Sequence, residues 1–123
     1  MKMSRKDPDF YSVMGPVFGS REIQRKTGDR FFDDDNKEWH VFTDLHGNVT
    51  TVLSVSKNLI KNVYANDMDC LFLLLKDIYP EIKSGIVPII YTEVFKSAGY
   101  RVSESSKNFI QVTGGFSDES DNK

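Results

Sequence analysis

Residues 57–76, KNLIKNVYANDMDCLFLLLK, contain a strand pattern that is followed at once by a helix pattern. The strand is expected at Leu59–Tyr64, and the apolar residues after it recur at the i, i+3, i+4, i+7 spacing of a buried helix face. Asn66 or Asp67 can cap the first turn of this helix, where Asp69 also suits the positive end of the helix dipole. A strand that leads directly into a helix N-terminus is a common place for an anion or cofactor site in α/β proteins.

The composition indicates one small domain with an ordinary core. The chain has 123 residues, of which 39% are hydrophobic and 28% charged, and its net charge is −2. This charge argues against a strongly basic nucleic-acid-binding protein but leaves room for a local basic patch. The single cysteine, Cys70, excludes an internal disulfide and fits a reducing compartment. No signal-peptide pattern and no stretch of about 20 apolar residues is present, so we expect a cytoplasmic protein without a membrane partner.

The pattern along the chain divides it into three parts. We expect residues 1–9 to form a flexible lead-in, residues 10–113 a single domain, and residues 114–123 a disordered acidic tail. Within residues 10–27 we expect two short helices or one kinked helix, because Gly15-Pro16 interrupts the helical spacing. Ser20 is expected to cap the second helix and Gly28 to end it.

The remaining elements follow in order. A hairpin is expected over residues 37–55, with Gly47 in its turn, and a third strand and the central helix within 57–76. After them we expect an apolar strand at 86–90, a helix at 91–98 that Gly99 ends, and a last hairpin over 100–112.

This order of elements resembles that of the GNAT acyltransferase superfamily, without the usual first strand of that family. The segment EWHVFTDLHGNVTTVLSV (38–55) is similar to the second and third strands of the family, and IKNVYAND (60–67) with LFLLL (71–75) to its fourth strand and cofactor helix. In VFKSAGYRVSESSKNFIQV (94–112), Phe95, Gly99 and Tyr100 fill the aromatic-x-x-x-G-aromatic pattern of its closing segment. The resemblance implies an α/β (α+β) fold with a mostly antiparallel sheet, a central splay and helices on both faces. Small GNAT-like proteins of this shape are common in phage genomes, which is compatible with a viral or mobile-element origin.

The resemblance also defines where a cofactor would bind. The family holds the pyrophosphate of acetyl-CoA on a loop of the form R/Q-x-x-G-x-G/A, because backbone N–H groups must approach the phosphates closely. The corresponding loop here is several residues shorter and contains no glycine, arginine or lysine; it consists of Asn66, Asp67, Met68, Asp69 and Cys70. Each contact between like charges at about 4 Å would cost roughly 4 kcal/mol at an effective dielectric constant near 20. Lys57 and Lys61 offset only part of this cost, so we expect the loop to be vestigial and acetyl-CoA not to bind.

Catalytic residues are not well defined by the sequence. The resemblance implies a general base on the hairpin strands and a tyrosine acid near the last helix. Glu38 or Asp44 stands where the base would be, and Tyr91 or Tyr100 where the acid would be. A buried or rim tyrosine with a solvated hydroxyl is the commoner role for such residues, so none is assigned to catalysis.

Three regions are candidates for binding a partner. The first is the aromatic and acidic stretch of Phe31, Phe32, Asp33, Asp34, Asp35 and Trp39. The second is the basic helix that carries Arg21 and Arg25, and the third is the vacated cofactor cleft that the resemblance implies. The acidic run would attract basic partners, and the arginines with the phenylalanines behind them could contact nucleic acid. His40 and His46 lie near the acidic run, but their spacing matches no metal-binding motif, so no metal site is expected.

Three functional hypotheses follow. The first is a degenerate GNAT-like pseudoenzyme that has lost acyl-CoA binding and acts by binding a protein, which would be a host protein in the host cytoplasm if the source is a phage. The second is an N-acyltransferase with an atypical short phosphate loop, using acetyl-CoA. The third is a nucleic-acid-binding module. Homodimerisation remains open, because an exposed hairpin edge invites pairing between copies.

Overall fold

A mixed seven-stranded sheet is the framework of the molecule. The computed structural model describes residues 1–34 and 36–117, and its strands follow the order β1-β2-β3-β4-β5-β7-β6. All neighbouring strands are antiparallel except β4 and β5. The strands are β1 (Lys2–Met3), β2 (Glu38–Thr43), β3 (Val49–Ser56), β4 (Leu59–Ala65), β5 (Ser84–Pro88), β6 (Arg101–Glu104) and β7 (Phe109–Thr113).

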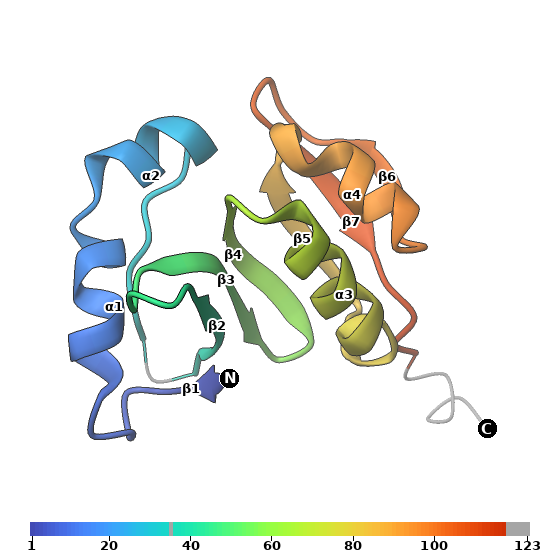
Figure 1. Cartoon of the computed structure of the whole chain (residues 1–123). Helices are drawn as coiled ribbons and strands as arrows, with labels where there is room; N and C mark the ends of the chain where they lie inside the picture. The colour runs from blue at the N-terminus through green and yellow to red at the C-terminus, as the bar shows by residue number, and fades with distance from the viewer. Residues whose placement is uncertain (35, 118–123) are drawn as a thin grey trace.

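Four α-helices among the described residues cover both faces of this sheet, which confirms the predicted fold class. Helices α1 (Phe10–Phe18) and α2 (Arg21–Thr27) lie on one side, and α3 (Met68–Ile78) and α4 (Thr92–Ser97) on the other (Figure 1). Two short 3₁₀ helices, η1 (Tyr79–Glu81) and η2 (Ile89–Tyr91), follow α3 and precede α4. No helix within the described part of the chain is long and apolar enough to cross a membrane.

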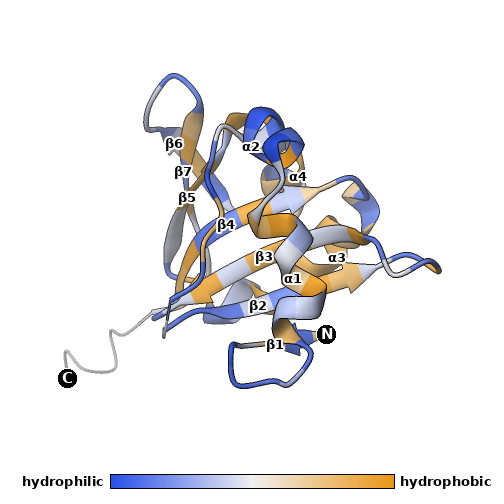
Figure 2. Ribbon diagram, turned by 90° about the vertical axis from the view of Figure 1, so that its left-hand side faces the viewer, coloured by the Kyte–Doolittle hydropathy of each residue, from blue (hydrophilic) through white to orange (hydrophobic). Residues whose placement is uncertain are grey.

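The sheet separates two hydrophobic clusters. On one face, α1 lies across β2 and β3 (Figure 2), and Phe10, Met14 and Val17 contact a cluster that includes Trp39 and Val52. On the other face, α3 and α4 pack on the middle of the sheet, and their buried residues share a second cluster with strand residues of β3, β4, β5 and β7. Alternate residues of a strand point to opposite faces, which is why β3 contributes Val52 to one cluster and Leu53 to the other.

Several local expectations are confirmed. Ser20 caps α2 through a hydrogen bond from the Ile23 N–H, and Gly28 ends that helix in the left-handed conformation with φ of 72°. Gly47 has φ of 84° in the turn between β2 and β3. These positions were predictable because capping and turn geometry depend on adjacent residues only.

Three details of the structure differ from the expected pattern. Lys2 and Met3 in the expected flexible lead-in pair with His40 and Trp39 of β2, and so supply a short first strand. The two expected short helices form, but Pro16 lies inside α1, and the break between the helices comes at Gly19–Ser20 instead of Gly15-Pro16. The residues just after β7 are not a free tail, since the N–H groups of 114–116 donate to carbonyls of η1 and of the segment before β5. Residues 118–123, the rest of the predicted tail, and Asp35 lie outside the described residues.

A glycine controls the parallel contact between β4 and β5. Gly85 pairs with Ile60, and a Cβ atom at position 85 would lie 2.8 Å from Ile60 Cβ and 2.9 Å from its carbonyl oxygen. We therefore expect Gly85→Ala to lower the free energy of unfolding by about 1–3 kcal/mol, as overpacking does. Urea denaturation measures this. Gly15→Ala is the control, because the added methyl group meets nothing within 4 Å and should stabilise α1 slightly; equal effects of the two substitutions would contradict the prediction.

Candidate functional site

The opening between β4 and β5 is filled by a tyrosine. Parallel pairing ends at Ile60, so the rest of β4 continues without a partner from β5. Tyr91 is fully buried, and its hydroxyl oxygen accepts a hydrogen bond from the Ala65 N–H at 2.9 Å. Burial raises the pKa of Tyr91 to about 12. The opening is therefore part of the hydrophobic core. The Ala65 N–H, which faces the opening, is bonded to the Tyr91 hydroxyl.

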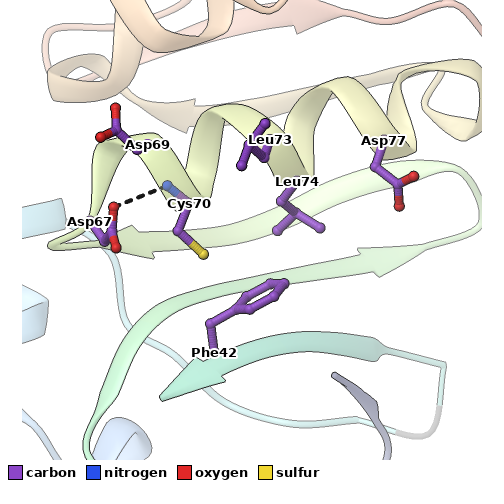
Figure 3. Close-up of a pocket in the computed structure, with 7 residues that line it drawn as sticks. All are labelled: Phe42, Asp67, Asp69, Cys70, Leu73, Leu74 and Asp77. Atoms are coloured by element: carbon purple, nitrogen blue, oxygen red, sulfur yellow. Dashed lines mark hydrogen bonds between the residues drawn. The ribbon is translucent and has the colours of Figure 1, made fainter. Parts of the chain in front are cut away.

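The junction between β4 and α3 uses an aspartate where an anion would bind. Asp67 is the N-cap of α3, and its carboxylate accepts a hydrogen bond from the Cys70 N–H at 3.0 Å (Figure 3). Asp69 adds a second carboxylate in the first turn. The N-terminal amides of a helix form its anion site, and here one of them is bonded to the chain's own carboxylate.

A lysine from another element reaches this junction. Lys26 belongs to α2, yet its Nζ donates to Asn66 Oδ1 at 2.7 Å and to the Ala65 carbonyl oxygen at 3.3 Å. Its Nζ also lies 5.5 Å from the centre of the Tyr64 ring. Sequence reasoning missed this cation, because the contact joins residues about forty positions apart and leaves no local signal.

A groove runs along α3 beside the junction. Its volume is about 460 Å³, and Figure 3 shows Phe42 of β2 facing the helix across it. Leu74 is buried at its base, while Leu73 is 67% exposed. We call this the α3 groove; it is lined by Phe42, Asp67, Asp69, Cys70, Leu73, Leu74 and Asp77.

A second recess lies between α3 and α4 and shares Asp69 with the groove. Its volume is about 400 Å³, and its lining includes Met68, Phe72, Ile90 and Glu93. Met68 is 41% exposed and Ile90 is 50% exposed. Exposed apolar residues therefore line both flanks of α3, and carboxylates lie along the helix between them.

Three of the four candidate catalytic residues do not meet at a common catalytic site. Tyr100 is buried, its hydroxyl donates to the Leu75 carbonyl oxygen at 2.7 Å, and burial raises its pKa. Tyr91 is buried in the β4–β5 opening. Glu38 is exposed at the start of β2, where it pairs with Lys2 at 3.9 Å. Glu38 lies opposite Val55, near one end of β3. Ala65, which contacts Tyr91, lies opposite Thr51, near the other end of β3.

The alternative base, Asp44, lies in the turn between β2 and β3. Its carboxylate accepts hydrogen bonds from the backbone N–H groups of His46 and Asn48, and these bonds lower its pKa. The side chain thus stabilises the turn, as an aspartate in this position commonly does.

The aromatic and acidic stretch is mostly structural. Trp39 is fully buried and Phe31 is 4% exposed, so neither can contact a partner, contrary to the expectation. Asp33 bonds to Trp39 Nε1 at 3.0 Å and to Arg5 Nε at 2.7 Å. Asp34 Oδ1 accepts from the Asn36 N–H. Phe32 alone among the described aromatic residues of this stretch is exposed, and Lys37 Nζ lies 4.1 Å from the centre of its ring.

Lys37 is the centre of a buried polar network beneath this stretch. Its Nζ donates to the Phe32 carbonyl oxygen at 2.9 Å and to Asn62 Oδ1 at 3.0 Å. Asn62 Oδ1 also accepts from Ser54 Oγ, and Asn62 Nδ2 donates to Asp29 Oδ2. Burial lowers the pKa of Lys37, while Asp34, Asp29 and Asp33 oppose that shift. The acidic run thus compensates a buried cation.

The basic surface of α2 is exposed, as the sequence suggests. Arg21, Gln24, Arg25 and Gly28 line a shallow recess of about 560 Å³. Lys26, in contrast, points to the junction described above.

Histidines do not build a metal centre in the described region. No group of three or more His, Cys, Asp or Glu side chains within residues 1–34 and 36–117 has the arrangement to hold a metal ion. His40 is partly buried in β2, and burial, with Lys2 and the N-terminal amine, lowers its pKa.

Comparison with known proteins gives no relative. No protein-family model matches the chain. A search of curated proteins and a search of solved structures likewise find no significant match.

Proposed function

We propose that this chain is a degenerate GNAT-like protein that has lost acyl-CoA binding and acts by binding a protein partner. The observation that carries the proposal is the hydrogen bond from the Cys70 N–H to the Asp67 carboxylate. A diphosphate seated at α3 would need this amide, and it would meet the negative charges of Asp67 and Asp69. The residues at the junction do not fit acetyl-CoA.

The filled β4–β5 opening supports the same proposal. Tyr91 is fully buried there with its hydroxyl bonded to Ala65, and Phe95 is fully buried in the same hydrophobic cluster. A ligand could enter between the strands only if these side chains left the core, which costs about 3–5 kcal/mol for a large aromatic residue.

Thermal denaturation with acetyl-CoA tests the proposal. A ligand present at 100 times its dissociation constant stabilises the folded state by about 2.7 kcal/mol. We expect the melting temperature to stay unchanged in millimolar acetyl-CoA, because the junction repels the diphosphate. ADP at the same concentration controls for ionic strength and for weak binding of any nucleotide. A clear rise with acetyl-CoA would overturn the proposal.

The alternative, an N-acyltransferase with a short phosphate loop, has one observation in its favour. Lys26 places a cation beside Asn66, where a phosphate group could be contacted. If acetyl-CoA does raise the melting temperature, Lys26→Met should abolish that rise. Lys61→Met, which replaces an exposed lysine on β4, should not.

A nucleic-acid-binding role rests on the recess around Arg21 and Arg25. It predicts DNA or RNA retention that weakens steeply with salt and is lost when both arginines are neutralised. The net charge of −2 makes this the weaker alternative.

A further inference from the structure

We infer that the α3 groove binds a basic amphipathic helix of a partner protein. This inference rests on the proposed function, since a protein partner is its premise, and it adds the place and the chemistry of the contact. The groove combines an exposed leucine, an aromatic wall and three carboxylates in one surface. Each of these features restricts what can occupy it.

The apolar part of the groove calls for an apolar side chain. Leu73 is 67% exposed on a helix whose neighbouring residue, Leu74, is 6% exposed at the base of the groove. Phe42 is only partly buried and packs against the core cluster from β2. A contiguous apolar hollow of about 460 Å³ accommodates one or two large aliphatic side chains, and such exposed apolar surface typically marks an interaction site.

The carboxylates set the charge of the occupant. Asp67, Asp69 and Asp77 line the groove, and none of them forms a salt bridge with a lysine or arginine of the described chain. Lys76 is the nearest basic residue in sequence on α3, and its Nζ lies over the Phe72 ring at 5.6 Å, on the side of the second recess. An occupant with lysine or arginine would supply the missing charge, whereas an acidic or anionic ligand would be repelled.

The spacing of the carboxylates favours a helical occupant. Asp69, Leu73 and Asp77 follow one another at i, i+4 and i+8, so the two carboxylates lie about 12 Å apart along α3 with the leucine between them. A partner helix laid along α3 matches this with basic residues about two turns apart and a leucine between them. An added β-strand would join the sheet at one of its edges, next to β1 or β6, and would not lie along α3.

Binding of a designed peptide tests the inference. The probe is a fluorescein-labelled, alanine-based helix of about 15 residues, with two lysines about two turns apart and leucines between them on the same face. The control probe carries glutamates in place of the lysines. We expect saturable binding of the lysine peptide by fluorescence anisotropy and at least tenfold weaker binding of the glutamate peptide.

Matched variants locate the binding surface. Asp69→Asn/Asp77→Asn should weaken binding about tenfold, since it removes both ion pairs that the lysines of the peptide would form. Leu73→Ala should also weaken it about tenfold or more, as loss of an apolar anchor does. The controls are Glu81→Gln/Glu104→Gln, which removes two exposed carboxylates outside the groove, and Leu45→Ala, which removes a fully exposed leucine in the β2–β3 turn. Both controls should bind as the unmodified chain does.

Several outcomes would overturn the inference. Equal binding of the two peptides, or unchanged binding by the groove variants, would exclude a basic helix in the groove. Self-association in sedimentation that Asp69→Asn/Asp77→Asn abolishes would assign the groove to a second copy of this chain instead. The melting experiment with acetyl-CoA tests the proposed function without involving the peptide. A failure of the inference can therefore be told apart from a failure of the proposed function.

Discussion

Replacing Asn62 by leucine is expected to lower the free energy of unfolding by about 3 kcal/mol. The leucine has nearly the same size, but it removes the acceptor of Ser54 Oγ and one of the two acceptors of Lys37 Nζ. It also removes the donor to the Asp29 carboxylate. Each buried polar group left without a partner costs about 1–3 kcal/mol, and more when it is charged.

Urea denaturation measures this effect as a lower midpoint at constant slope. Asn108→Leu is the matched control, because this asparagine is exposed and should change stability by no more than about 0.5 kcal/mol. Adding Lys37→Met to Asn62→Leu should recover part of the loss, since the buried charge is then gone. If Asn62→Leu alone matches the unmodified chain, the Lys37 network does not stabilise the fold.

Replacing Tyr91 by phenylalanine is expected to destabilise the chain near pH 8 but not near pH 12. At pH 8 the variant leaves the buried Ala65 N–H without a partner, at a cost of about 1–3 kcal/mol. In the unmodified chain the pKa of Tyr91 is raised to about 12 from the ordinary value of 10.0. A raised folded-state pKa gives stability that is complete below pH 10 and is lost as the pH rises toward 12, because the unfolded chain ionises first.

The loss for Tyr91 amounts to roughly 3 kcal/mol, since one pKa unit corresponds to about 1.4 kcal/mol. Denaturation curves recorded from pH 8 to pH 12 should therefore show the two proteins converging in stability. The raised pKa of Tyr100 lowers the stability of both proteins at high pH in the same way, so each is expected to unfold more easily there. Tyr11→Phe, at an exposed position, should stay parallel to the unmodified chain. A constant gap between Tyr91→Phe and the unmodified chain would contradict the role given to this hydroxyl.

Much of the fold was predictable because its signals are local. The apolar spacing of α3, the Asp67 cap and the glycine turn between β2 and β3 all depend on residues within a few positions of one another. The strand β1 was not predictable in the same way. It contains two residues, too few for any alternation, and it exists because β2 offers a free edge.

The candidate site was less predictable, because long-range contacts decide it. The run of aspartates reads as a solvated loop, yet Asp33 holds Trp39 and Arg5, and Asp29 reaches Asn62. Lys26 reads as part of a basic helix surface, but it bonds to the β4–α3 junction. The sequence around Asp29, Asp33 or Lys26 gives no signal of the residue that each one contacts, since that residue belongs to a distant part of the chain.

The short parallel contact between β4 and β5 affects how sequence variation would act on this molecule. Among the described residues, β4 and β5 pair only at Leu59–Ser84 and Ile60–Gly85, so side chains such as Tyr91 and Phe95 help to hold the two halves of the sheet at their present angle. A hairpin keeps its geometry when side chains are exchanged, whereas an angle set by packing changes with their volume. Substitutions accumulating in this core would tilt one half against the other and reshape the surface over α3 while leaving every hairpin intact.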